Sequence, residues 1–202
     1  MGFNLGNTNI GSLYVGSTKI GSAYLGSTKV YESIPPGPTF DEVTIGTQTW
    51  MAKNLAIDDG QGGIYTRTVN YGLGDVVEYY YTWDAAVRVA ANIDGWHLPS
   101  NKEWNSLISA AGGSSTAGTK LKSTYGWSSG NGDGSYNFAV FPAGYWNSGS
   151  FYNVSNAARF WTATEYSSTS AYVRMFNTGK QISSNYFTKT GRAHTIRLIK
   201  DA

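Results

Sequence analysis

The sequence contains no cysteine, few charged residues and no long apolar run. The absence of cysteine excludes disulfide bonds, thiolate metal sites and cysteine nucleophiles. No apolar stretch is long enough for a membrane-spanning helix, so we expect no membrane insertion. A net charge of +2 is too small to indicate nucleic acid as a partner. The start of the chain has neither the basic nor the apolar region of a signal peptide, so none is expected.

Glycine and aromatic residues are abundant instead. The 202 residues include 25 glycines, 15% aromatic and 41% hydrophobic residues, against 14% charged ones. This hydrophobic fraction excludes a disordered chain. The composition favours short strands, many turns and a surface of Asn, Ser, Thr and Tyr. The length suffices for one domain with its own core and an additional module.

The first 33 residues contain three copies of a ten-residue sequence repeat, of which the first is imperfect. Each copy places a short apolar or aromatic segment before a polar turn, a pattern typical of a β-meander. Such a module cannot bury its own apolar face, so it needs neighbours from this chain or from other copies. We predict three parts: a β-repeat module for assembly or attachment at 1–33, a Pro-rich linker at 34–40 and a ligand-binding domain at 41–202. The repeat module could join copies of the chain into a homo-oligomer.

Two segments of the second part have the pattern of helices. In "TWDAAVRVAANIDG", Thr82 can cap a helix whose inner side we expect to hold Ala86, Val87, Ala90 and Ala91. In "LPSNKEWNSLISAAGG", Ser100 and Glu103 have the spacing of a capping box ahead of an apolar stripe. The remainder indicates short strands and Gly-rich loops. This order of elements predicts an α+β fold.

A dense series of motifs runs through the second part of the chain. It includes "IGTQTWMAKNL" (45–55), "YTWDAA" (81–86), "GWHLPSNKEW" (95–104), "PAG" (142–144) and "FWTATE" (160–165). In this order the motifs resemble the major paralogous domain of Fibrobacter succinogenes, over roughly residues 43 to 201. That domain is similar to C-type lectins and to formylglycine-generating enzymes. The resemblance therefore implies a C-type-lectin-like domain with two helices and short antiparallel strands.

The resemblance brings no enzymatic activity with it. The formylglycine-generating chemistry needs cysteines, and the calcium-dependent sugar site of C-type lectins needs Glu-Pro-Asn or Gln-Pro-Asp with Trp-Asn-Asp; the sequence has none of these. "NGDGS" (131–135) lacks the further carboxylates of a calcium loop. We interpret His97 and Glu103 as structural residues. We therefore predict a non-enzymatic protein with no cofactor, no metal and no catalytic residue; an enzyme with altered chemistry is the most distant alternative.

The composition of residues 145–195 points to a binding surface. Here 25 of 51 residues are Tyr, Asn, Ser or Thr, and six are Lys, Arg or Glu. Antigen-binding loops have this mixture, because Tyr gives contact area and Ser and Asn give adaptable hydrogen bonds. For any single residue, a polar turn or the solvent face of a strand is the favoured explanation. As a group, we predict as ligand-binding residues Tyr145, Trp146, Asn147, Tyr152, Asn153, Asn156, Tyr166, Ser168, Tyr172, Asn177, Ser183, Asn185, Tyr186 and His194.

This part of the chain also resembles the variable proteins of diversity-generating retroelements, which mutate at adenines and so change Asn and Tyr codons. The N-terminal repeats resemble those of proteins from phages of gut bacteria. Together these resemblances imply a receptor-binding protein, in a virion (phage tail or surface) or extracellular. Its expected partner is a bacterial surface protein or glycan. The alternative is a structural or cell-surface assembly protein of a gut bacterium without a diversified site.

Overall fold

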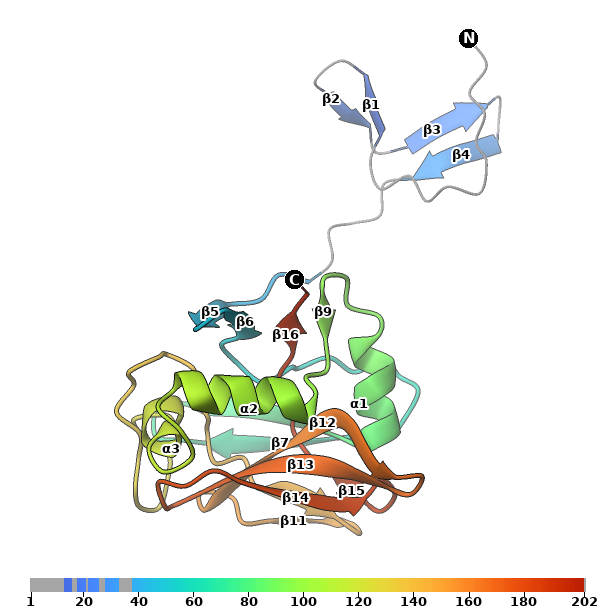
Figure 1. The fold of residues 1–202 in the computed structure, drawn as a ribbon. Helices are drawn as coiled ribbons and strands as arrows, with labels where there is room; N and C mark the ends of the chain where they lie inside the picture. Colours follow the sequence, from blue (N-terminus) through green and yellow to red (C-terminus); the bar gives the residue numbers. More distant parts are fainter. Residues whose placement is uncertain (1–12, 16–17, 21, 26–27, 33–37, 202) are drawn as a thin grey trace. The chain divides into compact units, whose positions relative to one another are not determined.

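The computed structural model describes residues 38–201 in full and four strands of the repeat region (Figure 1). The chain divides into two compact units, residues 1–39 and residues 40–202, and we call the second unit the head. In the first unit two antiparallel pairs are described, β1 (Leu13–Val15) with β2 (Thr18–Ile20) and β3 (Ser22–Leu25) with β4 (Thr28–Glu32). The apolar side chains that we expect to pack between repeats lie outside the described part.

Both predicted helices are present in the head. Helix α1 (Trp83–Ala90) begins where the Thr82 hydroxyl accepts a hydrogen bond from the backbone N–H of Ala85. Helix α2 (Asn101–Ala110) begins with both hydrogen bonds of the predicted capping box. The predicted inner side of α1 is partly wrong, because Ala85, Ala86, Val89 and Ala90 are buried while Val87 is exposed. A short third helix, α3 (Ala117–Leu121), was not predicted.

The predicted α+β class, a C-type-lectin-like domain with two helices, is wrong, because the fold is mostly β. Strands account for 39% of the structure and helices for 14%. The reason is that long polar and aromatic segments pair into extended antiparallel hairpins. The sheets are β5 (Glu42–Ile45), β6 (Gln48–Met51), β16 (Ile199–Lys200) and β9 (Trp96–His97); β7 (Ile64–Asn70) and β8 (Asp75–Tyr81); β11 (Ser150–Tyr152), β10 (Tyr145–Asn147) and β15 (Arg192–Ala193); and β12 (Ala157–Ser167), β13 (Ser170–Asn177) and β14 (Ser183–Thr188).

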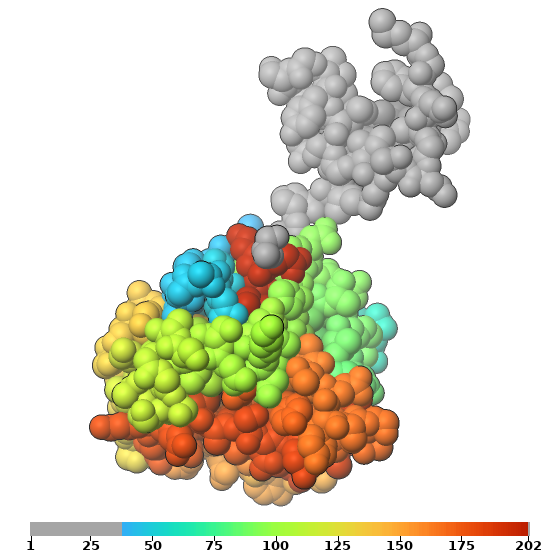
Figure 2. All heavy atoms as spheres, in the orientation of Figure 1, coloured from blue at the N-terminus to red at the C-terminus, as the bar shows by residue number. Residues whose placement is uncertain are grey.

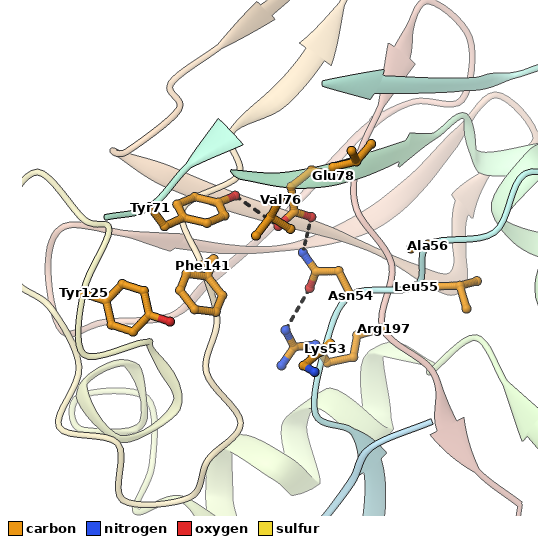
Figure 3. Close-up of a pocket in the computed structure, with 11 residues that line it drawn as sticks. Lys53, Asn54, Leu55, Ala56, Tyr71, Val76, Glu78, Tyr125, Phe141 and Arg197 are labelled. Carbon is orange, nitrogen blue, oxygen red and sulfur yellow. Dashed lines mark hydrogen bonds between the residues drawn. The ribbon is translucent and has the colours of Figure 1, made fainter. Parts of the chain in front are cut away.

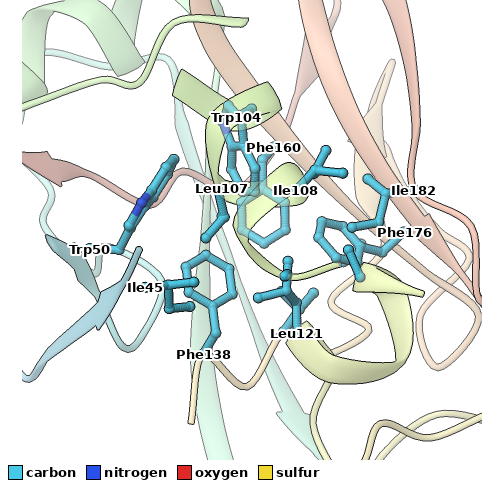
Figure 4. Close-up of a cluster of buried hydrophobic side chains, with 14 of the residues drawn as sticks. Ile45, Trp50, Trp104, Leu107, Ile108, Leu121, Phe138, Phe160, Phe176 and Ile182 are labelled. Atoms are coloured by element: carbon cyan, nitrogen blue, oxygen red, sulfur yellow. The ribbon is translucent and has the colours of Figure 1, made fainter. Parts of the chain in front are cut away.

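Helix α2 lies against the β12–β13–β14 sheet (Figure 1). Its buried residues are Trp104, Leu107 and Ile108. The centroid of the Trp104 ring lies 4.9 Å from that of Trp50 and 5.4 Å from that of Phe160, and all three side chains are fully buried (Figure 4). Burying rings of this size adds a large apolar area to a core that also contains many aliphatic side chains. The prediction that the tryptophans are mainly core residues is confirmed, since five of them are buried: Trp50, Trp96, Trp104, Trp127 and Trp161.

On the surface, the residues of α2 lie directly beside those of β12–β14, in green above orange and red (Figure 2). Helix α2 covers part of the sheet face on which it packs (Figure 1). Among the described residues, no helix combines the length and the apolar character needed to cross a membrane.

Candidate functional site

The β12–β13–β14 sheet displays predicted site residues on two opposite faces. Tyr172 of β13 pairs with Tyr186 of β14, so both side chains point to the same side. Ser183 and Asn185 alternate with Tyr186 along β14 and therefore point to the other side. The predicted residues thus do not form one continuous surface. They divide between two surfaces that the sheet separates.

The first surface is a group of three rings, Tyr166, Tyr172 and Tyr186, which we call the tyrosine cluster. Tyr166 and Tyr186 stack with ring centroids 3.6 Å apart and 4° between the ring planes. Tyr172 meets Tyr166 edge-on at 5.6 Å. The exposed fractions are 51% for Tyr166 and 45% for Tyr186. A hydrogen bond with Tyr186 raises the pKa of Tyr166, so the Tyr166 phenol stays neutral at physiological pH.

The start of helix α2 borders the tyrosine cluster. Arg174, two residues after Tyr172 and on the same face of β13, donates Nη2 hydrogen bonds to the carbonyl of Asn101, at 2.9 Å, and to Oδ1 of Asn105, at 2.6 Å. The backbone N–H of Asn101 also donates to the hydroxyl of Thr164 at 2.9 Å. These contacts fix the end of the sheet against the helix. The cluster therefore stands on a rigid support and not on a loose loop.

The second surface is formed by the β11–β10–β15 sheet together with Arg159 and Phe187, which lie on the face of the β12–β13–β14 sheet opposite to Tyr172. Tyr145 pairs with Tyr152, and Asn147 pairs with Arg192, so these four side chains share one face. The rings of Tyr145 and Tyr152 stack with centroids 5.7 Å apart. The guanidinium carbon of Arg159 lies 3.5 Å from the centroid of the Tyr145 ring. We call Tyr145, Tyr152, Arg159, Phe187 and Arg192 the arginine–aromatic patch.

Two predicted site residues belong elsewhere. Trp146 points to the opposite face of β10, where its ring stacks on Tyr65 at 3.8 Å as part of a small apolar cluster. The side chain of His194 is fully buried, with its ring 4.4 Å from that of Trp161. The prediction that His194 contacts a ligand is therefore wrong. Burial holds the pKa of His194 well below its usual value, and the charges of Arg159 and Arg192 lower it further, so the ring is neutral.

The remaining predicted residues are polar positions at turns and strand ends. The side-chain oxygen of Asn177 accepts a hydrogen bond from the backbone N–H of Gly179 at 2.8 Å, which closes a turn. That of Asn156 accepts a hydrogen bond from the Ser128 hydroxyl at 2.6 Å. For these two residues a structural role accounts for the side chain. Asn153 and Ser168 are exposed, and Ser168 lies in the turn between β12 and β13.

Sequence reasoning missed a cavity of about 290 Å³ on the β7–β8 side of the head (Figure 3). At its wall, the Tyr71 hydroxyl donates to Glu78 Oε1 at 3.1 Å and Asn54 Nδ2 donates to Glu78 Oε2 at 2.9 Å. Arg197 Nη2 in turn donates to Asn54 Oδ1 at 2.8 Å. Asn54 thus joins a buried carboxylate to a buried guanidinium. The remaining lining is mainly apolar and includes Phe141.

Burial governs the electrostatics of this network. It raises the pKa of Glu78, although the hydrogen bonds from Asn54 and Tyr71 oppose the shift. It lowers the pKa of Arg197 to about 9, with the charge of Glu78 acting in the opposite direction. The signal in the sequence is the position of Glu78, two residues before the inward-pointing Tyr80 on the same strand. A carboxylate on an inner strand face needs buried donors.

Within residues 38–201, no three His, Asp or Glu side chains gather as metal ligands.

The head is a mostly β domain that displays two aromatic surfaces around a tryptophan-rich core. The Fibrobacter succinogenes major domain (Fib_succ_major) matches residues 43–200, and the chain belongs to this family. The resemblance to the major paralogous domain is thereby confirmed. No curated protein and no solved structure matches the chain.

Proposed function

We propose that this protein is a non-enzymatic ligand-binding protein whose head contacts its partner through the tyrosine cluster. The observation that carries the proposal is the stacking of Tyr166 and Tyr186 at 3.6 Å with about half of each side chain exposed. Large apolar rings grouped on a surface mark binding sites, because exposing them to water is unfavourable unless a partner covers them. The expected partner is a bacterial surface protein or glycan, and the expected location is a virion or the extracellular space.

The geometry of the cluster supports binding in a second way. The rings of Tyr166, Tyr172 and Tyr186 already restrict one another, so a partner would immobilise little further side-chain freedom. Each hydroxyl group can make a further hydrogen bond beyond the one between Tyr166 and Tyr186, at the rim of an apolar surface. Tyrosine serves antibody paratopes for the same reasons.

We further propose that the gene of this protein is the target of a diversity-generating retroelement. The proposal is supported by the Tyr, Asn and Ser composition of residues 145–195 and by the exposure of Tyr152, Asn153, Tyr166 and Tyr186. The test is to sequence the DNA on both sides of the gene. A near-copy of the codons for 145–195 that differs mainly at adenines, beside a reverse-transcriptase frame, would support it. The absence of such a copy would contradict it.

The binding proposal is tested with fluorescently labelled full-length protein on a panel of intact gut bacteria, measured by flow cytometry. We expect the wild type to stain some strains and the triple variant Tyr166→Ala/Tyr172→Ala/Tyr186→Ala to stain none. Leu73→Ala is the matched control, because Leu73 is an apolar side chain with 77% exposure outside both surfaces. Equal staining by the triple variant and the wild type would contradict the proposal and favour an assembly protein.

A further inference from the structure

Arg159 and Arg192 approach the same aromatic ring from different strands. The guanidinium carbon of Arg159 lies 4.8 Å from the centroid of Phe187, and that of Arg192 lies at the same distance, 4.8 Å. The two guanidinium carbons are therefore no further apart than twice this distance. Each guanidinium can direct two parallel N–H donors toward an oxyanion, so two of them in one neighbourhood offer a carboxylate, sulfate or phosphate group two sets of donors.

Within residues 38–201, Arg159 and Arg192 have no acidic partner, in contrast to Arg88 and Lys189. Arg88 pairs with Asp59 at 2.7 Å, and Lys189 pairs with Glu165 at 2.6 Å. Among the described residues, neither Arg159 nor Arg192 forms an ion pair with a carboxylate. Two neighbouring positive charges thus lack compensation within the described part of the chain.

The surroundings increase the free-energy cost of holding the charged groups of Arg159 and Arg192 close together. Burial lowers the pKa of Arg159; the side chain of Tyr145 opposes this shift, and the positive charge of Arg192 adds to it. Like charges in a partly dehydrated site repel one another more strongly than in water. The neutral ring of His194 lies below, so no counter-charge comes from that side. A bound anion would remove the repulsion and occupy donors that are already oriented by ring stacking.

We propose that Arg159 and Arg192 form an oxyanion-binding site over the rings of Tyr145 and Phe187. The site takes a carboxylate, sulfate or phosphate group, either as a free anion or as a substituent of a saccharide. The Asn147 side chain shares the sheet face with Arg192 and offers neutral hydrogen-bonding groups beside it. The tyrosine cluster lies on the other face of the β12–β13–β14 sheet, so this proposal and the proposed function fail or hold independently.

The test is calorimetric titration of the full chain with sodium sulfate, sodium phosphate and sodium glucuronate, with glucose as the neutral comparison and ionic strength held constant with sodium chloride. We expect saturable binding of at least one oxyanion and none of glucose. Loss of one charged hydrogen-bonding partner should weaken the affinity by about tenfold or more in Arg159→Gln and in Arg192→Gln. Tighter binding of glucuronate than of the inorganic ions would assign the anion to a saccharide.

Arg67→Gln is the matched control, since Arg67 also lies over a ring, Phe151 at 5.5 Å, and no second arginine of the described part of the chain lies over that ring. Its affinity for oxyanions should equal that of the wild type. The melting temperature of each variant shows whether it folds. If Arg159→Gln does not fold, Arg192→Gln alone tests the proposal. The proposal is overturned if no oxyanion binds saturably, if glucose binds as well as glucuronate, or if folded Arg192→Gln binds as the wild type does.

Discussion

Tyr166 and Tyr186 stack face to face although they come from the two outer strands of a three-stranded sheet. The two rings meet beside Tyr172 of the central strand, which presents its ring edge-on at 83° to Tyr186. Aromatic pairs favour these stacked and edge-to-face geometries. The sheet itself needs no such contact for its hydrogen bonds, which join backbone atoms. The three rings therefore form a surface feature added to the sheet and not a part of the core.

Removing these rings should change stability little. In Tyr166→Ala/Tyr186→Ala we expect the melting temperature to fall by no more than about 4 °C, because both side chains are half exposed in the folded state. Thermal unfolding followed by circular dichroism measures this. Tyr80→Ala is the comparison, since Tyr80 is fully buried and its hydroxyl donates to the carbonyl of Ala143 at 2.6 Å. Its melting temperature should fall by more than about 10 °C. Equal losses in the two variants would make the cluster a core element.

Asn54 should be far more important for stability than a surface amide. Asn54→Ala removes the group that joins the buried side chains of Glu78 and Arg197, and each is left with an unsatisfied polar atom. We expect a loss of about 2–4 kcal/mol in the free energy of unfolding, measured in urea. Asn92→Ala is the control, because Asn92 is an exposed residue whose amide donates to the carbonyl of Arg88 at 2.8 Å. A loss below about 1 kcal/mol for Asn54→Ala would show that water satisfies the network.

The two helices and the family could be predicted from the sequence because their signals are local. The capping box of Ser100 and Glu103 depends on four consecutive positions, and the apolar stripe after it has a helical period. The fold class could not be predicted in the same way. Strands β12, β13 and β14 are rich in Tyr, Ser and Thr, and only their pairing with one another reveals them as one sheet.

The candidate site was predictable in composition but not in arrangement. Tyr172 and Asn185 have similar sequence signals, yet strand alternation places them on opposite faces. His194 has the same polar neighbourhood in sequence and is nevertheless fully buried. The role of Arg159 and Arg192 depends on a contact with Phe187 between three strands, which no local pattern encodes. Long-range register decides such contacts.

The two histidines should titrate in opposite ways. Burial lowers the pKa of His97, but hydrogen bonds with Glu103 and Asp201 outweigh it, so the net shift is upward from 6.5. His97 therefore stabilises the fold fully below the unfolded-state pKa, and this contribution is lost as pH rises through its folded-state pKa. The pKa of His194 is lowered well below 6.5, so His194 costs stability as pH falls below 6.5, where the unfolded chain takes up a proton.

Proton NMR of the imidazole resonances between about pH 5 and about pH 8 checks this difference. We expect one histidine to titrate above the ordinary value and the other not to titrate while the protein is folded. In His97→Gln the decline of stability above pH 6.5 should disappear, while the decline on acidification remains. Two histidines that titrate together near the ordinary value would contradict the buried, unprotonated His194.

Gly144 should tolerate no side chain, because two independent constraints act on it. Its φ of +73° lies in the left-handed region, and an added Cβ would collide with the carbonyl oxygen of Tyr152. Gly149 has a φ of +96° but open space around it, so Gly149→Ala adds only backbone strain. We expect Gly149→Ala to cost about 1 kcal/mol of unfolding free energy and Gly144→Ala at least about 2 kcal/mol more, measured in urea. Because Tyr145 and Tyr152 flank the collision, Gly144→Ala should also weaken oxyanion binding. Equal costs for the two variants would mean that the strand bearing Tyr152 moves freely away from Gly144, and the patch would then not be rigid.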